Sequence, residues 1–231
     1  FVYPQGQGHV IYSSIPINKH MSGNGTSPGV DNIKDIYAPN LVQYAATLVD
    51  PIVLDLDGDG LEFIHIDNQS VSFSMNPEYS QRPNDWVAPD DGFLVLDKNN
   101  NGIIDDIREM FSEFFADGVT TGVGALSTLD ENKDGVINSL DSQFANLKIW
   151  QDSNSDGQTN LGELKLFSDF GFSEINLNTQ HIDEKIGDSQ LVSIGLVEKI
   201  DGDNSLFGEL AISVTPNSKS SINSIESLSV N

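Results

Sequence analysis

Short apolar runs separated by polar loops dominate the pattern between residues 50 and 215. Apolar runs of roughly four to eight residues, bounded by Gly, Asp and Asn, are typical of β-strands. The two longest runs flank the residues Asp201-Gly202-Asp203-Asn204, which favour a hairpin turn. The pattern predicts strands at Pro51–Asp55, Leu61–Asp67, Phe93–Asp97, Lys148–Gln151, Leu191–Ile200 and Leu206–Val214.

Other segments carry apolar residues at the spacing of an amphipathic helix. Phe111 and Phe115 share one face of the first of them, and Leu164 and Phe167 share a face of the last. Gly171 follows as a residue typical of a helix C-cap. The helices predicted in this way cover Arg108–Phe115, Val123–Leu129, Leu140–Leu147 and Leu161–Phe170.

The two ends of the chain differ from its middle. Residues 1–49 are rich in Gly, Pro, Ser and Asn, and we expect a loosely structured leader with a short helix at Asn40–Leu48. The Ser- and Asn-rich residues 216–231 predict a flexible tail after a module at 50–215. Because the chain starts at Phe1, we expect it to be a piece of a larger protein.

Charge narrows the classes of partner. The chain has 35 acidic and 11 basic residues, a formal net charge of −24. Such a charge repels nucleic acid and anionic membrane surfaces, and it opposes a compact fold unless cations neutralise it. The chain has no cysteine, which excludes thiolate metal sites, and no apolar run approaches the ~18 residues of a membrane-spanning helix. We therefore expect a hard cation with oxygen ligands, no nucleic-acid partner and no membrane insertion by this segment.

Two loops match the calcium loop of an EF-hand, which has oxygen ligands at positions 1, 3, 5, 7, 9 and 12 and Gly at position 6. The segment 152–163, DSNSDGQTNLGE, fits at every position, and 130–141, DENKDGVINSLD, differs by having Asp at position 12. The position 7 ligand is a main-chain carbonyl. The expected ligands are Asp152, Asn154, Asp156, Gln158, Asn160 and Glu163 in one loop, and Asp130, Asn132, Asp134, Val136, Asn138 and Asp141 in the other.

Two further loops depart from the pattern near their ends. The loop that begins at Asp97 has Arg108 at position 12, so Glu109, one residue later, is the expected acid. The segment DLDGDG at 55–60 lacks later ligands and needs help from Asp67, Asp90 or Asp91; the alternative is a hairpin turn without metal. The expected ligands are Asp97, Asn99, Asn101, Ile103, Asp105 and Glu109 in the first of these loops, and Asp55, Asp57 and Asp59 in the second.

These elements together predict an α+β fold, in which EF-hand-like calcium loops and short helices pack on small antiparallel β elements. Each loop gathers several carboxylates of like charge, which is costly without a cation. We therefore expect Ca²⁺ as the cofactor, with a chain that is partly unfolded without calcium and compact with it. Loops of this kind suit a calcium-rich environment outside the cell.

The dipeptide Asp50-Pro51 lies at the boundary between leader and module. An aspartate carboxyl can attack its own main-chain carbonyl carbon and close a five-membered anhydride, and a proline nitrogen then leaves as a basic secondary amine. The reaction needs a carboxylate held in place, a proton for the nitrogen and stabilisation of the oxyanion. The sequence leaves the proton donor open among groups such as Tyr44, His65 and Lys34.

Three stretches resemble the self-processing module of FrpC-like RTX proteins, large secreted proteins of Gram-negative bacteria. They are DPIVLDLDGDGLE at 50–62, DWVAPDDGFLVLDKNNNGIIDDIREMF at 85–111 and GALSTLDENKDGVINSLDSQFANLKIWQDSNSDGQTNLGELKLFSDFGF at 124–172. The resemblance implies calcium-triggered autocatalytic cleavage, with Asp50 as nucleophile and Pro51 as the new N-terminus. It also implies capture of the Asp50 anhydride by a lysine amine of an acceptor protein, which forms an Asp–Lys isopeptide cross-link.

Two other interpretations compete with self-cleavage. One is a non-catalytic, calcium-stiffened structural module of a secreted RTX adhesin or toxin, in which Asp50-Pro51 is only a turn. The other is an EF-hand sensor that opens a groove for a partner, which three methionines in the whole chain disfavour because such grooves are rich in Met. We expect a secreted location, outside the bacterium or at its surface, as part of a larger protein.

Overall fold

A computed structural model describes residues 48–65, 68, 71–75, 82–186 and 189–213. These residues belong to one compact unit, Leu48–Thr215. The predicted leader, except Leu48 and Val49, and the predicted tail lie outside the described residues. Within the described part of the chain, no helix has the length and apolar character that crossing a bilayer requires.

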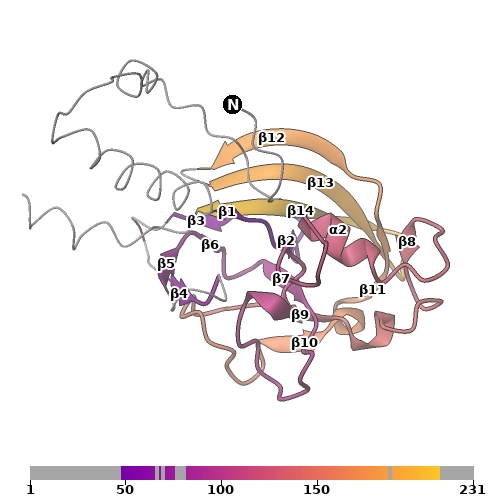
Figure 1. Ribbon diagram of the computed structural model, residues 1–231, viewed down its shortest axis with the longest axis horizontal. Coiled ribbons are helices and arrows are strands. Elements are labelled where there is room, and N and C mark those ends of the chain that lie inside the picture. Colours follow the sequence, from indigo (N-terminus) through magenta and orange to yellow (C-terminus); the bar gives the residue numbers. More distant parts are fainter. Residues whose placement is uncertain (1–47, 66–67, 69–70, 76–81, 187–188, 214–231) are drawn as a thin grey trace, which may run out of the picture. The chain divides into compact units, whose positions relative to one another are not determined.

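A ten-stranded antiparallel sheet forms the body of the unit and curls into half a barrel (Figure 1). Its central strand, β14, lies between β2 and β13 and also pairs with the short β1. The order of the main path is β10-β9-β7-β2-β14-β13-β11-β8, and β12 adds to β13. The strands are β1 (Leu48–Val49), β2 (Ile52–Leu54), β7 (Gly92–Val95), β8 (Val136–Ile137), β9 (Lys148–Trp150), β10 (Leu164–Leu166), β11 (Phe172–Asn176), β12 (Gln180–Ile186), β13 (Ser189–Lys199) and β14 (Asn204–Ser213).

Smaller elements complete the unit. Two separate two-stranded sheets are formed, one by β3 and β6 and the other by β4 and β5. Among the described residues, α2 is the one α-helix, and three single 3₁₀ turns accompany it. These elements are β3 (Phe63–Ile64), β4 (Val71–Phe73), β5 (Arg82–Asn84), β6 (Trp86–Val87), α2 (Gly122–Ser127), η2 (Ile107–Glu109), η3 (Phe144–Asn146) and η4 (Phe167–Phe170).

Both faces of the sheet are buried around β2 and β14. Ile52 and Leu54 belong to one apolar cluster, which also contains Phe207, whereas Val53 belongs to a second cluster with Leu210. Successive side chains of a strand point to opposite faces, so a strand covered on both faces has a continuous apolar run. The run around residue 53 therefore reflects a central strand rather than the edge of a small hairpin.

The predicted α+β fold with EF-hand-like helices is wrong, because the unit is mostly antiparallel β-structure with one short helix. The segment Leu161–Phe170 forms β10 and η4 instead of a helix, and β10 pairs with β9. Arg108–Phe115 contains only the end of η2 and a bridge from Met110 to Val95, and Leu140–Leu147 contains only η3. Helices of this length are marginal by themselves, whereas a neighbouring strand supplies backbone partners at once.

The remaining predictions have mixed outcomes. The hairpin of residues 191–214 is confirmed by β13 and β14, and α2 lies within the helix expected near Val123–Leu129. The strands near residues 53, 94 and 149 are also present. The hairpin around the Asp-Gly-Asp-Gly turn is wrong, because β3 pairs with β6 while β2 pairs with β7 and β14. Gly171 caps the 3₁₀ turn η4 in the left-handed conformation (φ 78°).

Candidate functional site

The loops that begin at Asp97, Asp130 and Asp152 share one backbone conformation. The residue at position 4 is left-handed in each of them, with φ of 56° at Asn100, 61° at Lys133 and 54° at Ser155. Left-handed residues other than Gly are uncommon. The glycine at position 6 also has positive φ in each loop, namely 78°, 87° and 70°. Three segments far apart in the sequence therefore turn in the same way.

The first carboxylate of each loop accepts hydrogen bonds from the amides at positions 5 and 6. Asp152 accepts from the amides of Asp156 at 3.1 Å and Gly157 at 2.8 Å. Asp97 and Asp130 accept from the equivalent amides at 3.0 to 3.2 Å. The amides thus fix the orientation of the first carboxylate in each loop.

The last acid of each loop connects its two ends. Glu163 accepts from the position 2 amide at 3.2 Å and from the position 9 amide at 2.8 Å. Asp141 makes the same two bonds at 3.0 Å each, and Glu109 makes them at 3.0 and 2.8 Å. Arg108, the residue at position 12 of that loop, pairs with Asp106 instead. Glu109 thus occupies the structural place of the terminal acid in the loop that begins at Asp97.

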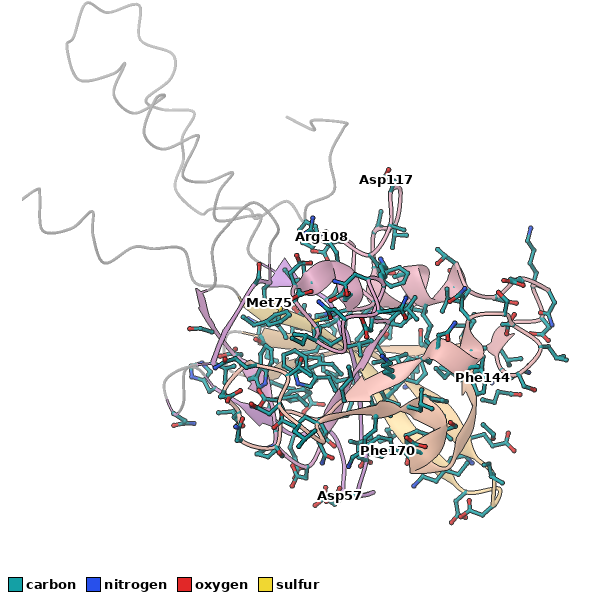
Figure 2. All side chains as sticks on the ribbon, turned by 90° about the horizontal axis from the view of Figure 1, so that it is seen from below. Asp57, Met75, Arg108, Asp117, Phe144 and Phe170 are labelled. Atoms are coloured by element: carbon teal, nitrogen blue, oxygen red, sulfur yellow. The ribbon has the colours of Figure 1, made fainter. Side chains whose placement is uncertain are left out.

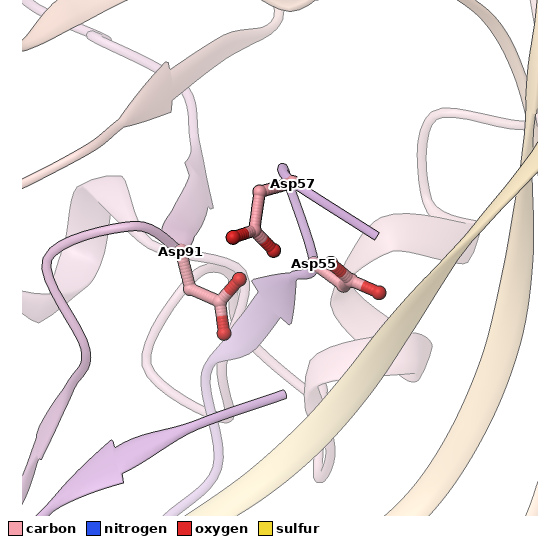
Figure 3. A group of neighbouring side chains, drawn as sticks. All are labelled: Asp55, Asp57 and Asp91. Carbon is pink, nitrogen blue, oxygen red and sulfur yellow. The ribbon is translucent and has the colours of Figure 1, made fainter. Parts of the chain in front are cut away.

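Asp91 takes this place in the loop at 55–60, although it lies more than thirty residues away. Its carboxylate accepts from the amides of Leu56 at 3.3 Å and Glu62 at 2.9 Å. Oxygen atoms of Asp55, Asp57 and Asp91 lie within 4.8 Å of one another (Figure 3). Leu54 pairs with Gly92 across β2 and β7, so the next residues, Asp55 and Asp91, meet where the two strands end.

Burial makes these carboxylates costly without a counter-charge. Asp55, Asp91, Asp97, Asp152 and the terminal acids of the other loops are nearly inaccessible, with at most 6% of their surface exposed. Within the described residues, the one lysine that pairs with any of them is Lys148, 2.8 Å from Asp97. Buried carboxylates need paired charges or metal ions.

Most of the loop residues between these acids face solvent, apart from a few such as Ile104, Ile137 and Ser155, which are buried. Asp57 is one of the exposed residues and projects from the surface of the unit (Figure 2). The side-chain and main-chain atoms of each loop that could ligate a metal ion are oxygen atoms. The buried acids carry negative charge that a bound cation would neutralise. An acidic cluster of this kind can hold a metal ion, and hard divalent cations are the class that fits such a donor set.

The Asp50–Pro51 bond lies within the sheet and not in a free linker. Val49 pairs with Ile212 and Ile52 pairs with Glu209, so the same register runs through Asp50 and Pro51 without a bulge. The amide of Leu210 donates to the Pro51 carbonyl at 3.0 Å. Proline has no N–H to return this bond. The bond is therefore fixed on both sides by pairing with β14, at a position where the ladder lacks one donor.

Two acidic residues that sequence reasoning missed lie beside Asp50. The Asp50 amide donates to Oε2 of Glu113 at 3.4 Å, and the two side chains also share a hydrogen bond. Burial, the largest cause, and the neighbouring Asp50 raise the pKa of Glu113 to about 9. Burial also raises the pKa of Glu209, with a further contribution from Asp50. A signal for Glu113 was absent from the sequence, because no motif surrounds it.

The first residue of α2, Gly122, approaches the Asp50 carbonyl closely. A Cβ atom on Gly122 would lie 2.5 Å from the Asp50 carbonyl oxygen and 2.8 Å from that of Phe111, so the position accepts only glycine without movement of the backbone. The Val123 amide donates to Glu209 at 3.2 Å, which fixes that carboxylate on the same side. Of the proton donors considered from sequence, His65 lies near Asp85, at 3.9 Å, and Tyr44 and Lys34 lie outside the described residues.

Comparison with known proteins identifies the family. The profile of the family described as SPM domain matches residues 52–213, more than half of the chain. The chain belongs to the SPM family. It is also 36% identical over 169 residues to the iron-regulated protein FrpA of Neisseria meningitidis serogroup C. That alignment covers 71% of this chain and 15% of FrpA, so the chain spans a small part of its relative's length. The predicted resemblance to a self-processing module is confirmed.

The loop 152–163 of this SPM domain is hydrogen-bonded to the aromatic core. The indole nitrogen of Trp86 donates to Oδ2 of Asp152 at 2.8 Å, and burial raises the pKa of that carboxyl. Trp86 packs edge-on against Trp150, with ring centroids 5.5 Å apart, and both rings are fully buried. A cation at the loop 152–163 would therefore change the environment of two tryptophans, and their fluorescence would report its binding.

We expect the loops to bind calcium, and replacing Asp91 by Asn should then weaken binding at one site. The substitution removes a buried carboxylate from the Asp55 loop and leaves the other three loops intact, so calorimetry would record one site fewer, or one weakened by at least ~10-fold. Asp90→Asn is the matched control, because the neighbouring Asp90 is exposed. Equal calcium isotherms for the two variants would show that Asp91 is no ligand.

Proposed function

We propose that this SPM domain cleaves its own Asp50–Pro51 peptide bond when it binds calcium. The carboxylate of Asp50 attacks the Asp50 carbonyl carbon, the bond to the Pro51 nitrogen breaks, and a five-membered aspartyl anhydride remains on the upstream fragment. Membership of the SPM family, a self-processing family, supports this reaction. Asp50-Pro51 is also the one Asp-Pro dipeptide in the chain.

The position of the bond in the sheet is the observation that carries the proposal. Pairing with β14 on both sides of the bond restricts the backbone of Asp50, so its side chain samples few orientations relative to its own carbonyl. Orientation of this kind supplies a large share of the rate in intramolecular reactions.

Calcium is proposed to act by completing the fold around this bond. The residues that would hold it are those of the four loops, with Asp91 added to the loop at 55–60. When bound, the ion neutralises buried carboxylates and thereby stabilises the strands that the loops connect. The loop at 55–60 follows β2 directly and begins only four residues after Pro51. Ordering of this loop by calcium would therefore also order the bond, because one short strand connects them.

The fate of the anhydride is a further part of the proposal. An anhydride is an acylating group, so a lysine amine of an acceptor protein would convert it to an Asp–Lys isopeptide bond, and water would convert it to free aspartate. Export as a segment of a larger RTX protein would bring the domain from a calcium-poor to a calcium-rich medium. The first encounter with calcium would then start the reaction.

Addition of millimolar calcium to the intact purified chain tests the proposal. Two fragments are expected on a denaturing gel, and N-terminal sequencing of the larger one should begin at Pro51. A magnesium-treated sample is the control, because Mg²⁺ demands a more rigid octahedral geometry than these loops offer. A chain that binds calcium and stays in one piece would leave the calcium-stiffened structural module as the function.

A further inference from the structure

The proposed cleavage lacks one component, a proton for the departing nitrogen. A proline nitrogen leaves as an amine only when it gains a proton as the carbon–nitrogen bond breaks. A proton donor for this nitrogen must lie beside Asp50. Among the described residues, two acids interact with Asp50, namely Glu113 from the turn after η2 and Glu209 from β14.

We propose that Glu113 is the proton donor of the reaction, an inference that rests on the proposed function. Its carboxyl group contacts the nucleophile directly, because it bonds both to the amide and to the side chain of Asp50. Three covalent bonds join the nitrogens of consecutive residues, so the Pro51 nitrogen lies within about 4 Å of the Asp50 nitrogen that faces Glu113. These two distances together place Oε2 of Glu113 within about 7 Å of the Pro51 nitrogen.

The protonation state of Glu113 fits the role of proton donor. Burial and the adjacent Asp50 keep Glu113 protonated at neutral pH, with a pKa of about 9, so it can give a proton where an ordinary glutamate would already be ionised. Glu209 is held by the Val123 amide and by Ser193, at 3.2 Å from each donor. Its bonds to these donors direct it toward α2 and β13, which makes it the weaker candidate.

The step balances in atoms and charge. One Oδ of the Asp50 carboxylate forms a bond to the Asp50 carbonyl carbon, and the bond from that carbon to the Pro51 nitrogen breaks. The electron pair of the broken bond stays on nitrogen, which takes the proton of Glu113. The products are the cyclic anhydride, a neutral secondary amine at Pro51 and the Glu113 carboxylate. The charge lost by Asp50 appears on Glu113.

Glu113→Gln in the full chain tests this assignment. The calcium-loaded fold should persist, as judged by tryptophan fluorescence and the melting temperature, because glutamine keeps the shape and hydrogen-bonding capacity of a protonated glutamate. The cleavage rate should fall by about 10²-fold or more, the usual contribution of a positioned general acid. Glu198→Gln, an exposed site on β13, is the matched control and should cleave at the wild-type rate.

A pH profile separates proton donation from a merely structural role. The wild-type rate should fall by about tenfold per unit above pH 9, as Glu113 loses its proton, and the residual rate of Glu113→Gln should lack this decline. Asp50 faces Glu113 and Glu209 faces Asp50, and both remain in the variant. Glu113→Asp, which keeps an acid, should be slow but retain an alkaline decline, and it serves as the test if the Gln variant does not fold.

The outcomes distinguish this inference from the proposed function. If the wild-type chain does not cleave with calcium, the proposed function fails, and the role of Glu113 fails with it. If the wild type cleaves but Glu113→Gln cleaves equally fast, or if the wild-type profile is flat through pH 9, only the assignment of Glu113 is overturned.

Discussion

Asp50→Glu is expected to abolish calcium-dependent cleavage while leaving the calcium-loaded fold intact. The longer side chain keeps the negative charge beside Glu113 but would have to close a six-membered ring, with its carboxylate displaced from the carbonyl carbon. Intramolecular attack depends steeply on this geometry, so a loss of about 10⁴-fold, below detection on a gel, is reasonable. Asp50→Ala should be equally inactive, because it has no nucleophile.

The matched control for these variants is Asp117→Asn. Asp117 is an exposed acid on a surface turn (Figure 2), and its loss should leave the cleavage rate unchanged. Cleavage at residue 50 in the Asp50→Glu chain, at a rate close to that of the wild type, would show that the side chain is not the nucleophile.

Removal of calcium is expected to unfold most of the domain. A site filled at 100 times its dissociation constant stabilises the folded state by about 2.7 kcal/mol, so four such sites contribute roughly 11 kcal/mol. This is comparable with the whole stability of an ordinary domain, about 5–15 kcal/mol. Chelation should therefore remove the cooperative thermal transition, or lower its midpoint by tens of degrees, and shift the emission of Trp86 and Trp150 as their core opens.

Screening has to be separated from specific binding in this experiment. Raising sodium chloride to the ionic strength of the calcium buffer reduces repulsion between exposed acids, but it cannot satisfy the buried carboxylates such as Asp91 and Asp152. Salt should consequently restore little of the transition. Identical melting curves with calcium and with chelator would contradict the view that the loops need a cation to fold.

Local features of the domain could be predicted from its sequence, and long-range ones could not. The loop that begins at Asp152 is continuous, so its spacing alone indicated which side chains gather there, and the hairpin of β13 and β14 follows from a turn between two apolar runs. Asp91 was only one of several candidates, because its place beside Asp55 depends on the pairing of β2 with β7. The register between distant strands has no signature in a short window.

The wrong helices have a related cause. An EF-hand loop is usually followed by a helix, and the apolar spacing at Leu164 and Phe167 agreed with that expectation. In this fold the segment after the loop meets the edge of β9, and pairing there satisfies its backbone better than a short isolated helix would. Glu113 was missed because an acid between Phe111 and Phe115 has no pattern until the fold brings Asp50 beside it.

Capture of the anhydride by a small amine is the most direct test of the central claim. The intact chain would be treated with calcium in the presence of excess Nα-acetyl-lysine, and the fragment that ends at Asp50 would be analysed by mass spectrometry. The account predicts an amide adduct located on Asp50, in an amount that rises with amine concentration and is absent when calcium is withheld. A chain that stays intact in saturating calcium, or a fragment that ends only in free aspartate at every amine concentration, would contradict it.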